Sequence, residues 1–500
     1  MTVLPFLSSA TRAGHKQHFL IGSCSLLNAK TSTLNTTALR EAEDAIYDVA
    51  RAAKHAPTST QVWFPLYAFE DYMSSVSADL WHQLLVKHLN GSKIVLDAND
   101  TVLAHSSVLL MGLDKLFVAY ASRSERLLEG VAWVFVERYL WTAGEAPNLR
   151  FATGVSTREE KAAACILQVD SRLGIRSAAA HVRERFNASS RAGLHAFVER
   201  IARMLQESLG GLSWIGQSAA HEAKRKLSGM KLDIFPSERL FDPNGVDNLY
   251  GAFSKLKKGV KAMSFIDYFI LHSGTLRRYL GSDHYEDVYR RRLFDTTAPL
   301  VEYFYYPNSL RISLVALETP LYSPDGTFAM NFGGLGTYVA RELSRSFDAV
   351  GTLVDSQGGA RTWWGPTESA DYKSKLSCDL DSTDMVEGNG SSSAGDTAHR
   401  VELFPHVPAL EALYRAYKHA TTSNEGFSVD VMHLPNLEDY TADQVFFLTF
   451  CHTVCTHKED PEAVKLCNLP LKNLRSFADA FHCPVGSPMN PLKKCTFFES

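Results

Sequence analysis

Amphipathic segments with few helix-breaking residues dominate the first half of this 500-residue chain. Between residues 39 and 280, apolar side chains recur every three to four positions in the segments Leu39–Ala53, His105–Phe117 and Leu194–Leu209. This period places them on one face of a helix. Phe235-Pro236 and Asp242-Pro-Asn-Gly245 predict a turn-rich connection between two helices. The pattern therefore predicts a helical N-terminal part.

The C-terminal part mixes helical and strand-like segments. Polar and apolar residues nearly alternate over Glu302–Leu317, which predicts one strand or a hairpin. A glycine-rich stretch leads into a predicted helix at Thr337–Phe347, and further helices are expected at Ala409–Ala420 and Ala442–Cys455. We expect a poorly defined segment at 1–38, a helical domain at 39–295 and a second domain at 296–500.

The composition excludes several classes of protein. The net charge is -4, from 51 Lys and Arg against 55 Asp and Glu, so no strong field would attract nucleic acid. The most apolar stretches, such as Leu127–Trp141, are shorter than the roughly 20 residues of a spanning helix. The first residues make a poor signal peptide because charged residues follow a very short apolar run. We expect no transmembrane segment in this chain and no nucleic-acid partner.

The cysteines and the glycosylation sequons favour an extracellular location. Six of the 8 cysteines lie in the last 123 residues, which is typical of a disulfide-bonded extracellular segment. Five Asn-X-Ser/Thr sequons require exposed asparagines if they are used. These glycosylation candidates are Asn35, Asn90, Asn99, Asn187 and Asn389. The sequence therefore predicts a secreted or cell-surface location.

The predicted helix near residue 340 carries the most informative residues. Val339, Leu343 and Phe347 recur at intervals of four and form one apolar stripe, whereas Arg341 and Arg345 share another face. Taken alone, such a mixture of charges is typical of a solvated helix face. Its neighbours change that interpretation.

The order of motifs around this helix resembles the neprilysin and endothelin-converting-enzyme family of zinc metalloendopeptidases. In that family a glycine-rich segment precedes a helix with HExxH, which is followed by Phe-Asp and a tryptophan pair. This chain has Asn331-Phe-Gly-Gly, Arg341-Glu-Leu-Ser-Arg345, Phe347-Asp348 and Trp363-Trp364 in that order. Further segments resemble the family upstream and downstream: Leu212–Ile215, Glu222–Met230, Ala409–Tyr417, Gln444–Phe450, Phe477–Cys483 and Met489–Cys495.

The resemblance is dense over 200–500 and thinner back to about residue 40. It implies a mainly α (α+β) fold with two lobes. The C-terminal domain would be thermolysin-like and of the catalytic type, and the N-terminal lobe helical. The family's usual cysteine-rich start has no counterpart here, so we expect an N-terminally shortened member.

The resemblance also implies a lost zinc site. Arg341 and Arg345 replace both histidine ligands, and Glu402 aligns with the third ligand. A guanidinium stays protonated and has no lone pair, so it repels a dication. One glutamate cannot hold zinc alone. We expect no cofactor here, although active family members bind zinc.

Other functional positions differ as well. Glu342 matches the general base that activates the metal-bound water, which has no role without a metal. Asp348 and His406 align with residues that support the zinc ligands, and His406 replaces an aspartate. Glu302-Tyr303 align with the Asn-Ala pair that holds the substrate backbone. The oxyanion histidine has its nearest counterpart around 457–461, where a carboxylate replaces it.

Without the metal, the crowded carboxylates would repel one another, which is costly unless other positive charges replace the metal. We therefore hypothesise that Arg341 pairs with Glu402, and that Arg345 pairs with Asp348 or Glu402. The alternative is that both arginines point to solvent.

The resemblance implies a disulfide between Cys378 and Cys495. Cysteines like Cys165, Cys455 and Cys483 pair, in the family, with partners in a segment that this chain does not contain. Cys24, Cys451 and Cys467 remain as candidates for them. The segment 451–457 could alternatively bind a metal through two cysteines and nearby histidines, but its spacing matches no standard zinc finger.

We therefore expect a catalytically inactive homologue, a pseudoenzyme that binds peptides or extracellular protein partners. The alternative is a residual zinc-dependent endopeptidase acting on small extracellular peptides, with a metal held elsewhere, for example by His406. A third alternative is a non-functional fragment of a longer gene product.

Overall fold

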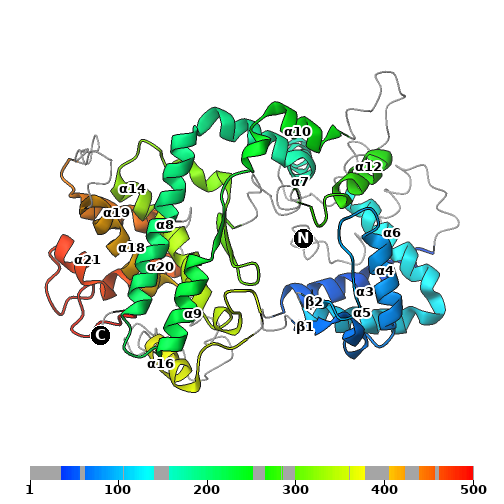
Figure 1. The fold of residues 1–500 in the computed structure, drawn as a ribbon, viewed down its shortest axis with the longest axis horizontal. Coiled ribbons are helices and arrows are strands. Elements are labelled where there is room, and N and C mark those ends of the chain that lie inside the picture. The colour runs from blue at the N-terminus through cyan, green and yellow to red at the C-terminus, as the bar shows by residue number, and fades with distance from the viewer. Residues whose placement is uncertain are drawn as a thin grey trace. The chain divides into compact units, whose positions relative to one another are not determined.

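A computed structural model describes residues 35–56, 62–104, 106–139, 157–251, 265–282, 284, 299–359, 361–377, 405–422, 438–455 and 461–498. Contacts divide the chain into two compact units (Figure 1). The first comprises 1–177 and 242–292, and the second comprises 178–241 and 293–500. The second unit therefore starts earlier in the sequence than the predicted domain at 296–500.

Helices and one small sheet build the first unit. Helix α3 (Thr36–Lys54) packs against α5 (Ser107–Tyr120) and α6 (Ser124–Tyr139). Gly130 allows α6 to approach α3 closely. A Cβ added at this position would lie only 2.7 Å from the Cβ of Ala42. Strands β1 (Val62–Pro65) and β2 (Thr101–Ala104) pair antiparallel. The other elements are η3 (Leu66–Asp71), α4 (Ala78–His88), η4 (Ala121–Arg123), α10 (Pro243–Leu249) and α12 (Phe265–Arg277).

Helix α7 (Thr157–Arg185) starts in the first unit and ends in the second. It leads to α8 (Ala188–Gly210), whose Leu194, Val198 and Ile201 are completely buried. The i, i+4, i+7 spacing of these residues gives α8 one apolar face. Helix α8 packs against other helices of the second unit. Helix α9 (Gln217–Ser228) follows and packs on α8.

A mixed three-stranded sheet lies in the second unit. Its order is β3-β5-β4, with β3 (Lys231–Asp233) parallel to β5 (Ser309–Ile312) and β4 (Val301–Phe304) antiparallel to β5. Strand β4 is thus an edge strand of this sheet. Its Val301 and Tyr303 side chains are buried, whereas Glu302 and Phe304 lie on the half-exposed face.

Helices complete the second unit around this sheet. The short helix α14 (Phe328–Gly333) leads into α15 (Leu335–Ser344), which packs on α8, β4 and α18 (His406–Thr422). The remaining elements are η7 (Glu238–Leu240), η8 (Leu314–Leu317), η9 (Arg345–Phe347), η10 (Gly351–Leu353), α16 (Pro366–Ser377), α19 (Ala442–His452), α20 (Pro461–Asn473) and α21 (Arg475–Ala480).

The predicted fold class is confirmed, since the described part is mostly helical with few strands. The Glu302–Leu317 segment forms the hairpin of β4 and β5 followed by a 3₁₀ turn. The predicted turn at 242–245 is wrong. Helix α10 starts there because Asp242 caps it, accepting from the backbone N–H of Asn244 (3.0 Å), and Pro243 occupies its first turn.

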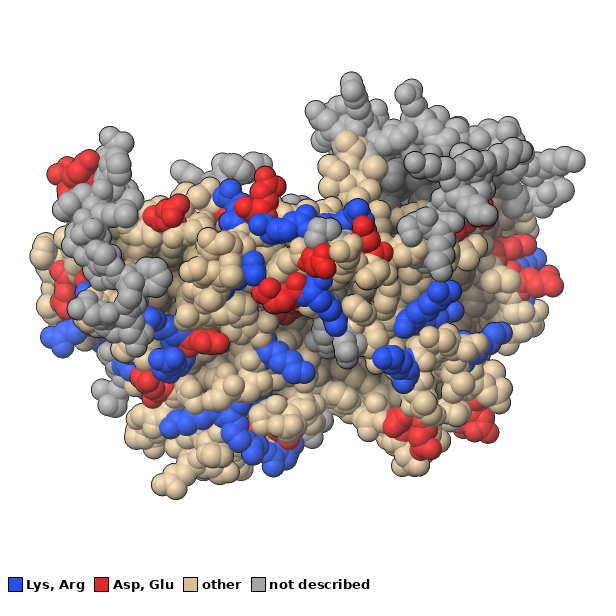
Figure 2. Space-filling model, turned by 45° about the horizontal axis from the view of Figure 1, so that its top comes forward, with Lys and Arg blue, Asp and Glu red and all other residues tan. Residues whose placement is uncertain are grey.

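The surface charge matches the near-neutral composition. On the face drawn in Figure 2, basic and acidic side chains are interspersed over most of the described surface. Among the described residues, no helix is both long and apolar enough to cross a membrane.

Candidate functional site

Glu342 lies between two arginines. It sits on α15 and is 6% exposed. Arg345 Nε donates to Glu342 Oε1 at 3.0 Å, and Arg341 Nε lies 3.7 Å from the same oxygen. The i, i+3 spacing brings Arg345 one helical turn from Glu342, where an ion pair forms readily. The residue aligned with the family's general base is therefore held by an ion pair.

The second oxygen of Glu342 contacts the edge strand. The backbone N–H of Tyr303 donates to Glu342 Oε2 at 3.2 Å. The Tyr303 ring is buried, and its hydroxyl donates to Asn308 Oδ1 at 2.9 Å. This bond fixes the end of the β4–β5 turn, where Asn308 adopts a φ of 45°. Both oxygens of Glu342 thus have donors within the protein.

Arg341 lies against an aromatic ring. Its guanidinium carbon is 5.0 Å from the centre of the Tyr338 ring, and 24% of its side chain is exposed. Its Nε is buried and makes no hydrogen bond with any described residue. Burial lowers the pKa of Arg341 below its ordinary value, while Glu342 opposes the shift. Arg341 remains a cation at neutral pH.

The Asp348 carboxylate accepts hydrogen bonds from a neighbouring hydroxyl and two backbone N–H groups. Its Oδ1 accepts from the backbone N–H groups of Val350 (2.9 Å) and Gly351 (2.7 Å), and its Oδ2 accepts from the Tyr305 hydroxyl (2.7 Å). Burial raises the pKa of Asp348, and these hydrogen bonds oppose the shift. The predicted pair of Arg345 with Asp348 is corrected accordingly. Arg345 pairs with Glu342, because three other donors already occupy the Asp348 carboxylate.

Burial works to lower the pKa of Arg345, but the Glu342 carboxylate and the adjacent Tyr305 outweigh it and raise that pKa. The alternative partner, Glu402, lies outside the described residues, so the pairing of Arg341 or Arg345 with Glu402 stays a prediction.

His406 begins helix α18 and is buried. Burial lowers its pKa to about 3, and the positive charges of Arg341 and Arg345 act in the same direction. The imidazole is therefore neutral at physiological pH. A neutral group beside two cations avoids the repulsion that a protonated histidine would cause.

Glu302 and Tyr303 lie on the edge strand β4, and their role as substrate-site positions stays a prediction. Glu302 is paired in register with Arg311 of β5. Burial raises the pKa of Glu302, an effect that Arg311 opposes and Glu342 reinforces. A partly buried carboxylate thus lies at the position that the resemblance aligns with the family's asparagine.

Sequence reasoning assigned no role to Lys226. This lysine of α9 is fully buried, and its Nζ donates to the carbonyls of Gly351 (2.6 Å) and Val354 (2.7 Å). Trp363 Nε1 donates to the same two oxygens at 3.0 and 3.1 Å. Burial lowers the pKa of Lys226 to about 8. The lysine and the tryptophan hold the loop whose N–H groups bind Asp348.

A signal for Lys226 was present in the sequence. The buried positions of α9 are Ala219, Glu222, Ala223, Lys226 and Leu227, so the lysine and one glutamate share a helix face with apolar residues. A lysine on a buried helix face is unusual unless hydrogen-bond acceptors or an opposite charge lie beside it.

These residues do not fit zinc. The two arginines offer no lone pair, and the Glu342 oxygens accept hydrogen bonds from Arg345 and Tyr303. Within the described ranges, no group of three or more His, Cys, Asp or Glu side chains is placed to hold a metal ion. The donor set around α15 instead provides two fixed positive charges.

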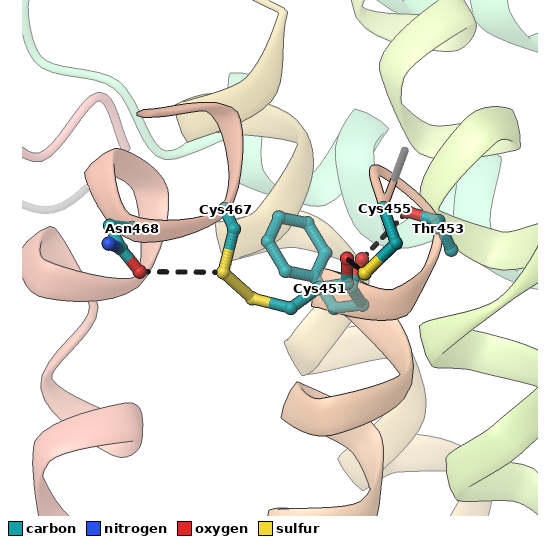
Figure 3. Close-up of a disulfide and its surroundings, with 6 residues drawn as sticks. Cys451, Thr453, Cys455, Cys467 and Asn468 are labelled. Carbon is teal, nitrogen blue, oxygen red and sulfur yellow. Dashed lines mark hydrogen bonds between the residues drawn. A yellow bond between two sulfur atoms is a disulfide. The ribbon is translucent and has the colours of Figure 1, made fainter. Parts of the chain in front are cut away.

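The cysteines pair differently from the expected combinations. Cys451 of α19 and Cys467 of α20 form a disulfide with a Cα–Cα distance of 5.0 Å (Figure 3). Neither is therefore a partner for Cys165, Cys455 or Cys483, which are thiols. The alternative that the 451–457 segment binds a metal is also weakened, because Cys451 is in a disulfide and cannot be a ligand.

Cys495 is disulfide-bonded. Its predicted partner Cys378 lies outside the described residues, as does Cys24, so the Cys378–Cys495 pairing stays a prediction. Among the sequons, Asn35, Asn90, Asn99 and Asn187 are exposed, and Asn389 lies outside the described residues.

Comparison with known proteins agrees with the predicted family and fold. Residues 303–497 match peptidase family M13. Neprilysin-2 of Caenorhabditis elegans is 25% identical over 93% of this chain and 65% of its own length. Endothelin-converting enzyme 1 of Rattus norvegicus is 27% identical over 66% of this chain and 44% of its own length.

Two solved structures share the fold. PepO from Lactobacillus rhamnosis superposes with a TM-score of 0.62 at 19% identity, covering 97% of this chain and 75% of that one. The zinc metalloprotease Zmp1 of Mycobacterium tuberculosis gives 0.60 at 14% identity, with 97% and 75% coverage. These likenesses concern the fold alone.

The helical fold, with the glutamate-bearing helix α15 beside an edge strand, is that of a metallopeptidase-like protein. The chain belongs to the neprilysin and endothelin-converting-enzyme family of zinc metallopeptidases. It spans 65% of the length of Neprilysin-2 and 44% of that of endothelin-converting enzyme 1.

Proposed function

We propose that this protein is a non-hydrolytic member of the neprilysin family, which binds peptides or extracellular protein partners without cleaving them. The observation that carries the proposal is the engagement of both Glu342 oxygens, one by Arg345 and one by the Tyr303 N–H. A general base must be within reach of the proton it removes. Here a guanidinium and a backbone amide occupy that carboxylate.

The positive charges support the same proposal. Relatives in this family use zinc to polarise the scissile carbonyl and to lower the pKa of the attacking water. Arg341 and Arg345 supply charge at the aligned positions, but a guanidinium cannot generate a hydroxide. Glu302 places a carboxylate at a substrate position, which would repel the oxyanion that develops during peptide hydrolysis.

We further propose an extracellular, glycosylated protein. Four exposed sequon asparagines and the Cys451–Cys467 disulfide support this location. The alternative of a residual zinc-dependent endopeptidase needs a metal ligand such as His406. That residue is 7% exposed and lies near two arginines, an environment that opposes a dication.

The test combines metal analysis with a peptidase assay on the full chain. The wild type and the Arg341→His plus Arg345→His variant would be loaded with Zn²⁺, desalted and analysed by mass spectrometry. Both would then be incubated with fluorogenic peptides, with and without a chelator. We expect neither bound zinc nor chelator-sensitive cleavage for the wild type. The double variant should gain zinc but cleave only weakly, because Glu302 remains.

A matched control distinguishes zinc binding by any i, i+4 histidine pair from zinc binding that depends on this site. Arg203→His plus Glu207→His creates an i, i+4 pair on the exposed face of α8 in the same unit. This control should bind zinc more weakly than the site variant and should not cleave. Stoichiometric zinc in the wild type, together with cleavage that the chelator abolishes, would overturn the proposal.

A further inference from the structure

Two guanidinium groups remain partly accessible at the centre of the site. The Arg341 side chain is 24% exposed and that of Arg345 is 39% exposed. They lie one helical turn apart on α15 and η9, with Glu342 between them. Glu342 bonds Arg345 at 3.0 Å, whereas its distance to Arg341 Nε, 3.7 Å, exceeds that of a hydrogen bond.

The orientation of Arg341 is fixed before any ligand arrives. Its guanidinium stacks over Tyr338, and the Tyr338 hydroxyl donates to the carbonyl of Thr453 at 2.8 Å. The buried Arg341 Nε lacks a hydrogen-bond acceptor among the residues described. A stacked guanidinium presents its donors as a planar fork, which loses little conformational entropy when it binds.

Among the described residues, the carboxylates of Glu342 and Asp348 accept hydrogen bonds from donors other than Arg341. Glu342 accepts from Arg345 and Tyr303, and Asp348 accepts from three donors of its own. Glu302 lies in register with Arg311, which pairs with Asp233 at 3.4 Å, and Glu302 forms no ion pair with Arg341. The buried His406 imidazole is neutral at physiological pH and supplies no negative charge. Within the described part of the chain, no carboxylate hydrogen-bonds to Arg341.

We propose that Arg341, assisted by the exposed part of Arg345, binds a carboxylate group of a peptide ligand. This inference rests on the proposed function, because a metal at this position would displace the arginines. Planar guanidinium groups match carboxylates through paired N–H···O bonds, which are shorter and stronger than neutral ones. The carboxylate could be a peptide's C-terminus or the side chain of an Asp or Glu residue.

The experiment uses the full chain and three labelled peptides of one length and apolar sequence. The first has an amidated C-terminus and no acidic residue, the second has a free C-terminal carboxylate, and the third is amidated with one internal Glu. Fluorescence anisotropy measures the Kd of each. We expect at least one carboxylate peptide to bind about tenfold more tightly than the neutral one, the effect of one charge-assisted bond.

Variants assign the preference to the site. Arg341→Gln should abolish it, and Arg341→Lys should retain only part of it because a lysine lacks the fork. Arg345→Gln serves as a second variant. Arg203→Gln, which removes an exposed guanidinium from α8, should leave all three Kd values unchanged. Circular dichroism and thermal melting check that each variant is folded.

The three peptides also separate the sources of the carboxylate. A preference for the free-acid peptide alone assigns the site to C-termini, and one for the internal Glu peptide alone assigns it to side chains. Equal affinity for all three peptides, or a preference that survives in both Arg341→Gln and Arg345→Gln, would overturn the inference. Metal analysis of the same preparation distinguishes this failure from a failure of the proposed function.

Discussion

The backbone N–H of Tyr303 donates to the carboxylate of Glu342 across a sequence separation of 39 residues. This bond joins the outer side of edge strand β4 to helix α15. An N–H on that side of an edge strand is free to pair with another extended chain. In this protein Glu342 occupies it, so the aligned general base serves as a structural link between the helix and the sheet.

Replacing Glu342 should therefore destabilise the fold. Glu342→Ala leaves the Tyr303 N–H unsatisfied and Arg345 without its ion pair, so we expect a loss of about 2–3 kcal/mol in the free energy of unfolding. Glu342→Gln retains an acceptor and should cost less. Urea denaturation measures both, with the exposed Glu207→Ala on α8 as control. Unchanged stability in Glu342→Ala would show that the link contributes nothing.

His406 should make stability depend on acid pH. Its folded pKa of about 3 lies below the ordinary 6.5, so the unfolded chain binds a proton that the folded chain does not between these values. Stability from this group is complete above pH 6.5 and falls as the pH drops toward 3, by at most about 1.4 kcal/mol per unit. His406→Gln should show a smaller loss between pH 7 and 4.5. The exposed His221→Gln should follow the wild type, and parallel curves for all three proteins would contradict the assignment.

Lys226 should act at alkaline pH. Its folded pKa of about 8 is lower than the ordinary 10.5, so raising the pH within this window removes a proton from the unfolded chain that the folded chain has already lost. Wild-type stability relative to Lys226→Met should rise between pH 7.5 and 9.5. Thermal melting across this range gives the difference. Lys224→Met, an exposed neighbour on α9, should show no such trend relative to the wild type.

The disulfide between α19 and α20 should stabilise the C-terminal part. Cys451 and Cys467 enclose a separation of 16 residues, for which loop closure predicts about 3 kcal/mol. Cys451→Ser plus Cys467→Ser should lose stability of this order. The matched control is Cys455→Ser, which removes a thiol without removing this bridge. If a reductant lowers the melting temperature of the double variant as much as that of the wild type, this bridge is not responsible.

Local spacing was sufficient to predict part of the site. The periodicity of Val339, Leu343 and Phe347 orients the helix, and the spacing of Arg341, Glu342 and Arg345 brings the three charges together on it. The hairpin at Glu302–Leu317 likewise follows from alternation. Each of these features depends on residues close in sequence.

The long-range contacts could not be predicted in the same way. The Tyr303–Glu342 bond depends on how β4 packs against α15, and the Lys226 contacts depend on how α9 approaches the 351–354 loop. Sequence reasoning paired Arg345 with Asp348 or Glu402 because it could not see the donors from Tyr305, Val350 and Gly351. Cys451 and Cys467 were expected as candidate partners of Cys165, Cys455 and Cys483, and their bond to each other depends on how α19 and α20 lie together.

The chain enters the second unit, leaves it at residue 242 and returns to it near residue 293. During synthesis, α8 and β3 are made well before α15, α18 and β5, against which they pack. Until α15 and α18 emerge, the part of α8 that packs on them stays uncovered. A fragment that starts at residue 293 would lack α8 and β3, leaving its own helices exposed and prone to aggregation.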